Sequence, residues 1–310
     1  MYERTPLRTK SVKRNKSEAP KKRKLINVLS LEIIMAEKLA IIMSGGGMKS
    51  SFGVGVILAL AEKYNITEPF LLICGSGSAG TGSYYISKQY KSIRNIWTNL
   101  VSSKNFLSWK RFWKIIDIDY LIYVIFKKQD PLKEKLIYAS KTRYLIPALN
   151  KNTGNIDYFD NQKGMDVFEN MRATKAMPIA FKMNPSIKIN GSVYCDSLVS
   201  SRAETHIQKA IDLGANKILI INNISYQKKG LDNLFFSLWI FFQKCKKQYY
   251  EIEKKSSNHQ IPEDVKIFTI APKSKLKITT LNNNIDLLRQ TIDQGYQETI
   301  SNNKLRLFLK

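Results

Sequence analysis

The feature that most constrains the fold is a unit that occurs twice in the first third of the chain. Each copy is a short continuous apolar run, then a glycine-rich turn, then a segment with apolar residues at helical spacing. Short uninterrupted apolar runs are typical of strands buried on both faces of a parallel sheet. The two units place strand, turn and helix at 38–43, 44–50 and 52–61, and at 70–75, 75–80 and 79–90.

Further segments of the same kind occur later in the chain. Residues 217–222 and 265–271 are two more buried-strand candidates, and a helix is expected between about 203 and 213, ending at Gly214. Strands that alternate with helices favour an α/β fold with a mostly parallel sheet. We therefore expect one domain over residues 36–310.

The charge of the chain is strongly positive. The formal net charge is +25, and residues 1–34 supply +7 of it, with ten Lys or Arg against three acids. We expect residues 1–35 to be a basic, disordered extension, or sequence upstream of a true start at Met35. Lysine outnumbers arginine 39 to 11, which favours diffuse attraction to an anionic surface over bidentate reading of bases. An AT-rich genome would produce the same bias.

Compartment and membrane signals are weak. The three cysteines (Cys74, Cys195 and Cys245) show no paired spacing, so a reducing compartment is expected. No apolar stretch reaches the roughly 18 to 20 residues of a membrane span, and the apolar run at 25–35 is interrupted by Glu32 and lacks a cleavage site. The sequence indicates a cytoplasmic protein, with peripheral contact with an anionic membrane as its predicted association.

Two segments mix aromatic and basic residues, at 104–128 and at 231–247. This composition is typical of helices at a lipid interface. An ordinary core-facing helix with a solvated basic flank has the same composition, and both interpretations stay open. Nucleic acid is not an expected partner, because no recognition motif for it is visible, although a basic nucleic-acid-binding protein remains an alternative on charge alone.

The first glycine turn, SGGGMKS, does not fit a nucleotide-binding loop. A Walker A loop needs glycine where Met48 stands, and a dinucleotide fingerprint needs glycine where Ser50 stands. Consecutive glycines at a helix N-terminus can instead turn several N–H groups toward one point. That arrangement stabilises an oxyanion, provided that a nucleophile lies nearby.

The second turn, GSGSAG, can supply the nucleophile. A serine raised on a sharp strand-to-helix turn needs small residues two places before and after it. Ser78 meets this need with Gly80 after it, and Ser76 stands where glycine is usual. A Gly-Ser turn without chemistry is the alternative for this hexapeptide alone.

A serine nucleophile needs a base, and the chain has only two histidines. His259 lies in a polar loop and His206 in a presumed helix, so a structural role is favoured for both. A carboxylate can act directly if it is within hydrogen-bond reach of the hydroxyl. The best placed acid is Asp196, which ends a short apolar run before another small turn.

At these residues the chain resembles the patatin-like phospholipase family, particularly its bacterial members. IIMSGGGMKSSFGVGVILAL (41–60) is similar to the glycine-rich oxyanion loop, SGSAG (76–80) to the G-x-S-x-G elbow, and NGSVYCDSL (190–198) to the stretch that carries the catalytic aspartate. The segments PALNKNTGNIDYF, MRATKAMPIAF and IDQGYQETI also resemble parts of the family. The resemblance covers roughly residues 38–300.

The resemblance implies a three-layer α/β sandwich with a central, mostly parallel sheet. It implies an enzyme, a carboxylic ester hydrolase that cleaves phospholipid or lysophospholipid acyl esters with a Ser-Asp dyad and without metal or cofactor. By this analogy Ser78 is the nucleophile and Asp196 the base. Lys49 and Gly80 support the two turns, and the oxyanion donors are expected among Gly45, Gly46, Gly47 and Ala79.

Three positions depart from the family pattern. Ser50, Ser76 and Ser197 each stand where the family usually has glycine. A Cβ at these places could displace the oxyanion donors or Asp196. A catalytically weakened protein that binds anionic membrane is therefore the alternative to an active hydrolase.

Overall fold

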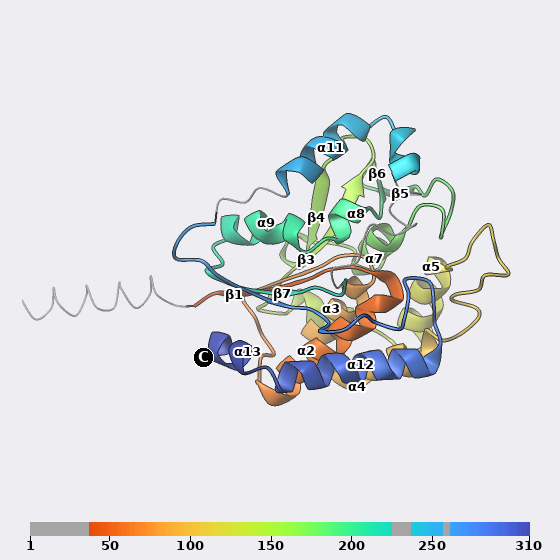
Figure 1. The fold of residues 1–310 in the computed structure, drawn as a ribbon. Helices are drawn as coiled ribbons and strands as arrows, with labels where there is room; N and C mark the ends of the chain where they lie inside the picture. The colour runs from red at the N-terminus through yellow and green to blue at the C-terminus, as the bar shows by residue number, and fades with distance from the viewer. Residues whose placement is uncertain (1–36, 225–236, 257–260) are drawn as a thin grey trace, which may run out of the picture. The chain divides into compact units, whose positions relative to one another are not determined.

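The computed structural model describes residues 37–224, 237–256 and 261–310. The expected N-terminal extension at 1–35, residues 231–236 of the second aromatic segment and His259 lie outside the described residues. Residues 38–310 form one compact unit, shown in Figure 1.

One sheet of eight strands runs through this unit. The strand order is β5-β6-β3-β2-β1-β7-β8, and β4 pairs with β3 beside this path. The strands are β1 (Leu39–Met43), β2 (Leu71–Cys74), β3 (Arg143–Asn150), β4 (Ile156–Asp160), β5 (Ile187–Ile189), β6 (Ser192–Cys195), β7 (Lys217–Ile221) and β8 (Lys266–Ile270).

The parallel half of the sheet confirms the expected strands. β1 pairs in parallel with β2 and β7, β2 with β3, and β7 with β8. All residues of β2 and β7 are buried, as expected for strands covered on both faces. The carboxyl ends of β1 and β2 lie next to each other, with Met43 opposite Cys74. The two glycine turns therefore leave the sheet side by side.

The other half of the sheet is antiparallel and was not anticipated from the sequence. β3 pairs with β4 and β6 in antiparallel fashion, and β5 pairs with β6. β5 and β6 are three and four residues long, and a two-residue turn at Asn190 and Gly191, both with positive φ, joins them. Segments this short carry too few residues for a periodicity signal.

Helices lie on both sides of the sheet, with α2, α3, α4 and α12 on one face and α8 and α9 on the other (Figure 1). This arrangement is the three-layer α/β sandwich with a mostly parallel sheet that the sequence predicts. The α-helices are α2 (Ser51–Lys63), α3 (Ser78–Ile86), α4 (Tyr90–Asn95), α5 (Ile118–Tyr120), α6 (Glu134–Tyr138), α7 (Val167–Lys175), α8 (Leu198–Ser201), α9 (Ile207–Asp212), α11 (Lys246–Lys255), α12 (Ile285–Ile300) and α13 (Asn303–Leu309). Short 3₁₀ turns are η1 (Gly47–Ser50), η4 (Asn161–Lys163) and η5 (Glu204–His206), and wider π-type turns are η2 (Ile96–Leu100) and η3 (Leu121–Gln129).

The helix after the first glycine turn is held by α12. A Cβ on Gly55 would lie 1.9 Å from the carbonyl oxygen of Ile292, and one on Gly295 would lie 2.1 Å from that of Phe52. The two helices therefore approach at backbone distance, which only glycine allows. This contact fixes α2, and with it the loop that precedes α2. Within the described ranges, no helix combines the length and the apolar character needed to cross a membrane.

Candidate active site

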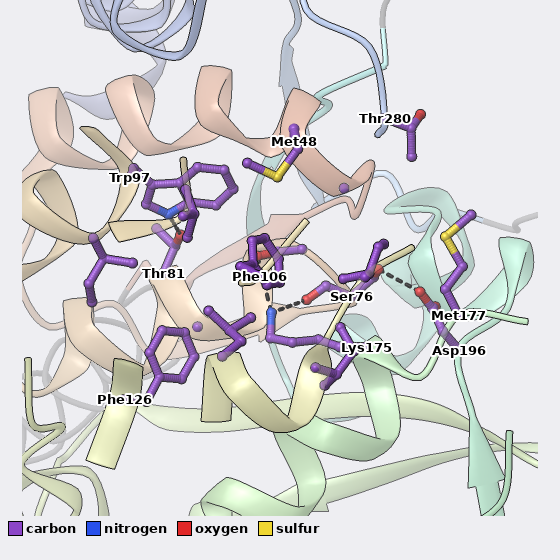
Figure 2. Close-up of a pocket in the computed structure, with 18 of the residues that line it drawn as sticks. Met48, Ser76, Thr81, Trp97, Phe106, Phe126, Lys175, Met177, Asp196 and Thr280 are labelled. Carbon is purple, nitrogen blue, oxygen red and sulfur yellow. Dashed lines mark hydrogen bonds between the residues drawn. The ribbon is translucent and has the colours of Figure 1, made fainter. Parts of the chain in front are cut away.

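The second glycine turn raises Ser76 out of the sheet. β2 ends at Cys74 and α3 begins at Ser78, so three residues make the change of direction. Ser76 has a φ of 48°, in the left-handed region that non-glycine residues seldom adopt. Its Oγ donates a hydrogen bond of 2.6 Å to Oδ2 of Asp196 (Figure 2), and its N–H donates to Oγ1 of Thr174 at 3.0 Å. The structure thus pairs Ser76 with the predicted base.

Ser78, the predicted nucleophile, points elsewhere. Its side chain is fully buried, and its Oγ donates to the carbonyl oxygen of Ser44 at 2.6 Å and accepts from Nδ2 of Asn223 at 3.1 Å. The prediction that Ser78 is the serine beside Asp196 is wrong, because α3 begins at Ser78 and turns it toward the first glycine loop. Ser78 instead ties the two turns together.

Asp196 comes directly after β6 and is almost fully buried. Oδ1 accepts the N–H of Ser197 at 2.7 Å while Oδ2 accepts the hydroxyl of Ser76. Burial raises the pKa of Asp196 to about 7, and these hydrogen bonds and the charge of Lys175 oppose that rise. The carboxylate therefore changes its protonation state near neutral pH, where a general base is most effective.

Lys175, which the sequence analysis did not single out, lies inside the site. Its Nζ donates to the carbonyl oxygens of Ser76 at 2.6 Å and Gly77 at 3.3 Å (Figure 2). Burial lowers its pKa to about 8, and the nearby charge of Asp196 opposes that effect. A lysine within the otherwise apolar and small stretch ATKAMP was the available signal. The ammonium holds the turn in place and adds positive charge beside the carboxylate.

The amides of the first glycine loop differ in their hydrogen bonding. The N–H of Gly45 donates to the carbonyl oxygen of Ser201 at 2.7 Å, so the prediction of Gly45 as an oxyanion donor is wrong. Gly46 and Gly47 have φ values of 131° and 57°. In the described part of the chain, neither of their N–H groups has a hydrogen-bond acceptor. These two predicted donors remain available.

The amide of Gly77, the residue after Ser76, is a candidate oxyanion donor in place of the amide of Ala79. The N–H of Ala79 donates to the carbonyl oxygen of Ser76 at 3.2 Å, so the prediction of Ala79 as a donor is wrong. A Cβ on Gly77 would lie 3.2 Å from N and 2.8 Å from O of Gly47, which places the two backbones in contact. The amide of Gly77 has no acceptor within the described ranges either. Gly46, Gly47 and Gly77 together form a candidate oxyanion hole.

Lys49 and Gly80, the two residues predicted to support the turns, lie next to the first and the second glycine turn. Lys49 lies in η1, directly before α2. Gly80 lies in the first turn of α3, and a Cβ there would be 2.8 Å from the ring of Phe126. Gly80 thus gives room to a side chain of the pocket. Ser50 is buried beside Gly77, and Ser197 is extended and caps α8 with its hydroxyl.

A mostly apolar pocket opens beside Ser76. It encloses about 690 Å³ of space not filled by protein atoms, its open mouth included. Ser76, Gly77, Gly47, Lys175 and Asp196 contribute to its lining on one side. Trp97 and Phe126 lie on the side away from Asp196 and Met177 (Figure 2). Apolar lining residues include Tyr84, Ile96, Trp97, Phe106, Leu121 and Phe126.

His206, the histidine within the described residues, is bonded away from this site. Nδ1 of His206 is 2.8 Å from the hydroxyl of Tyr158, and Nε2 is 3.1 Å from the carbonyl oxygen of Ser200. Burial lowers the pKa of His206 to about 4, so it is neutral near pH 7. Neither ring nitrogen contacts Ser76 or Ser78. Among the residues that the structure describes, no group of three or more His, Cys, Asp or Glu could hold a metal ion.

Fold and site together define an α/β protein with a serine on a strained strand-to-helix turn and an aspartate as its partner. A comparison with protein families matches the patatin-like phospholipases over residues 41–207, more than half of the 310-residue chain. The chain belongs to the patatin-like phospholipase family. Among curated proteins no relative matches it.

A solved structure supports the same fold. The crystal structure of VipD from Legionella pneumophila is similar to this chain with a TM-score of 0.51 and 10% sequence identity. The similarity covers 88% of this chain and 67% of that one. At this identity the comparison speaks to the fold alone. The covered share is larger than the part of the chain that the family match spans.

Proposed function

We propose that this chain is a serine lipid acyl hydrolase that cleaves acyl esters of phospholipids or lysophospholipids, with Ser76 as nucleophile and Asp196 as general base. The observation that carries the proposal is the 2.6 Å hydrogen bond from Ser76 Oγ to Asp196 Oδ2, in the lining of an apolar pocket. Membership of the family supports the class of reaction. The choice of Ser76 over Ser78 is the geometric part of the proposal.

The first half-reaction forms an acyl-enzyme. Asp196 in its ionised form takes the proton of Ser76 as Oγ attacks the ester carbonyl carbon. The carbonyl oxygen becomes an oxyanion, and the N–H groups of Gly46, Gly47 and Gly77 stabilise it. The tetrahedral intermediate collapses, and the protonated Asp196 gives its proton to the leaving alkoxide of the glycerol backbone.

The second half-reaction restores the enzyme. Asp196 takes a proton from a water molecule, whose oxygen attacks the acyl carbon, and the same amides stabilise the second oxyanion. Collapse releases the fatty acid, and the proton on Asp196 returns to Oγ of Ser76. Lys175 keeps the carbonyl ends of the turn fixed through both steps, because it binds the carbonyl oxygens of Ser76 and Gly77.

The pocket supports an acyl chain as the group that is bound. Its wall beyond the serine is apolar, and Trp97 and Phe126 lie in that part. Ligand sites of this kind are apolar with a few polar groups that fix orientation. The polar residues Ser76, Lys175 and Asp196 lie together in this lining, so the ester would lie at Ser76 and the hydrocarbon against the apolar residues.

The proposal is tested by product analysis. The full chain is incubated with phosphatidylcholine and lysophosphatidylcholine vesicles, and released fatty acid is measured by mass spectrometry, with the Ser76→Ala variant as control. We expect fatty acid from the parent and a loss on the order of 10³-fold in the variant. Equal release from both proteins, or none from the parent on lipids and on short-chain p-nitrophenyl esters, would contradict the proposal.

A further inference from the structure

The wall of the pocket is continuous with a projecting loop. Phe106 and Ile116 both line the pocket, and the chain between them leaves and returns at the same place. Leu107 and Ile116 form an antiparallel bridge, and the N–H of Ser108 donates to the carbonyl oxygen of Ile115 at 2.9 Å. The N–H of Asp117 donates to the carbonyl oxygen of Phe106 at 2.7 Å. The loop thus has a hydrogen-bonded stem, and it extends outward before α5 in Figure 1.

The end of this loop carries three exposed aromatic side chains, which we call the aromatic tip. Trp109, Phe112 and Trp113 are 64%, 81% and 61% exposed. The rings of Phe112 and Trp113 meet edge to face at 4.9 Å, so they form one apolar surface. Three large aromatic side chains in a five-residue stretch are costly to leave in water, and exposed patches of this kind mark contact sites.

The tip is held outward by its own hydrogen bonds. The guanidinium of Arg111 donates to the carbonyl oxygens of Asn105 at 2.9 Å and Phe106 at 3.1 Å, which fastens the middle of the loop to its stem. Lys114 is paired with Asp117 at 2.8 Å. Lys104, just before the stem, and Lys110, between Trp109 and Phe112 in the sequence, are in contrast exposed. The surface around the tip is therefore apolar with a positive margin.

We propose that the aromatic tip is the surface by which this protein docks on an anionic lipid bilayer, with the rings of Phe112 and Trp113 inserted and Lys104 and Lys110 among the headgroups. The proposal rests on the proposed function, since it places the bilayer at the mouth of the acyl pocket. An acyl chain that leaves the bilayer along the stem reaches Phe106 and Ile116 first.

A lipid surface fits these residues better than a protein partner. Tryptophan and phenylalanine beside lysine are the composition of side chains that sit at a membrane interface. The net charge of +25 opposes a basic partner and favours an anionic surface. Because the stem is continuous with the pocket wall, a bilayer bound at the tip would also lie beside the route by which substrate enters the pocket.

A second exposed aromatic pair supplies a matched control. Phe241 and Phe242 are 57% and 76% exposed, and their rings meet edge to face at 5.4 Å. They do not line the acyl pocket. Trp239 of the same segment packs in a core cluster with Tyr249, in agreement with the core-facing interpretation that the sequence left open.

The test compares two double variants in a background that cannot turn over lipid. Phe112→Ala/Trp113→Ala and Phe241→Ala/Phe242→Ala are each made in the full chain with Ser76→Ala. Trp109 is left in place because its Nε1 donates to the carbonyl oxygen of Leu281 at 3.1 Å, next to the pocket residue Thr280. Vesicle flotation then measures binding to phosphatidylcholine alone and to phosphatidylcholine mixed with phosphatidylglycerol.

We expect the tip variant to bind mixed vesicles roughly 30-fold more weakly, as two partly inserted aromatic side chains are lost. The control pair should change binding by less than about twofold. With Ser76 restored, the tip variant should hydrolyse a soluble p-nitrophenyl ester within about twofold of the parent. Salt at about 0.5 M should weaken binding of the parent, because it shortens the Debye length.

Parental binding by the tip variant, or an equal loss in the control pair, would overturn the proposal. Equal binding of the parent to neutral and mixed vesicles, or no effect of Lys104→Glu/Lys110→Glu, would overturn the role of charge. The binding arm uses an inactive background, so its result does not depend on turnover. If the tip variant loses binding but the parent releases no fatty acid, the docking surface stands and the proposed function fails.

Discussion

The hydroxyl of Ser76 and the carboxylate of Asp196 are joined by a 2.6 Å hydrogen bond, although 120 residues separate them in the sequence. They meet because β3 lies between β2 and β6 in the sheet, so the turn after β2 and the end of β6 face each other across one strand. The other carboxylate oxygen is held by the N–H of Ser197. The orientation of Asp196 toward Ser76 is thereby fixed before any substrate arrives.

Replacement of the carboxylate by an amide should remove the base and keep the shape. We expect Asp196→Asn to lower kcat/KM for a soluble ester by on the order of 10³-fold, because general base catalysis typically contributes about 10²- to 10⁴-fold. Asp157→Asn, which changes a carboxylate on β4, is the control and should stay within about tenfold of the parent. A fully active Asp196→Asn protein would exclude this residue as the base.

The pH profile should track the protonation of Asp196. Burial raises the pKa of Asp196 to about 7, and only the ionised form can accept the proton of Ser76. Below that pH we expect kcat/KM to fall about tenfold per unit as the carboxylate takes up a proton. A steady-state profile with a soluble ester measures this directly. A profile that is flat down to pH 5 would be inconsistent with a buried carboxylate as the base.

The charge of Lys175 should set the pH at which kcat/KM falls on the acidic side of the profile, which we call the acidic limb. Its positive charge favours the ionised form of Asp196 and lowers the carboxyl pKa. Removal of the charge in Lys175→Met should therefore move the acidic limb to higher pH and lower kcat at neutral pH. Lys182→Met removes an exposed lysine and serves as the control. If both variants keep the parental pH profile, the ammonium of Lys175 supports the turn and does not influence the protonation of Asp196.

Gly77 should be intolerant of any side chain. A Cβ there would lie 2.6 Å from Oγ of Ser50 and 2.8 Å from the carbonyl oxygen of Gly47, so the candidate oxyanion hole must shift. We expect Gly77→Ala to lower kcat by roughly 10²-fold, the effect of losing one donor. Gly164→Ala, at a site with a φ of 72° and open space for a Cβ, should cost some stability and leave kcat unchanged. Parental kcat in Gly77→Ala would remove this amide from the oxyanion hole.

The parallel half of the fold was predictable because its strands are continuous apolar runs ended by glycine turns. β1, β2, β7 and β8 lie within one or two residues of their expected bounds. The antiparallel strands β5 and β6 were missed, since their pairing depends on the long-range partner β3 and not on local pattern. Local sequence carries little information about such pairing.

The site shows the same division between local and long-range information. Asp196 and the first glycine loop could be found from residue type and spacing. The two serines of GSGSAG are alike in sequence, and the motif alignment chose Ser78. Which of them faces the aspartate depends on where α3 begins, and this is set by contacts of Ser78 with Ser44 and Asn223. The role of Lys175 likewise depends on α7 packing beside the turn.

The assignment of the nucleophile is tested most directly by covalent labelling. A fluorophosphonate forms a stable adduct with the activated serine, and tandem mass spectrometry of the labelled peptide locates it, because fragments that break on either side of Gly77 separate the two serines. We predict the adduct on Ser76, no labelling of Ser76→Ala, and labelling of Ser78→Ala on Ser76. An adduct on Ser78 in the parent protein would contradict the assignment.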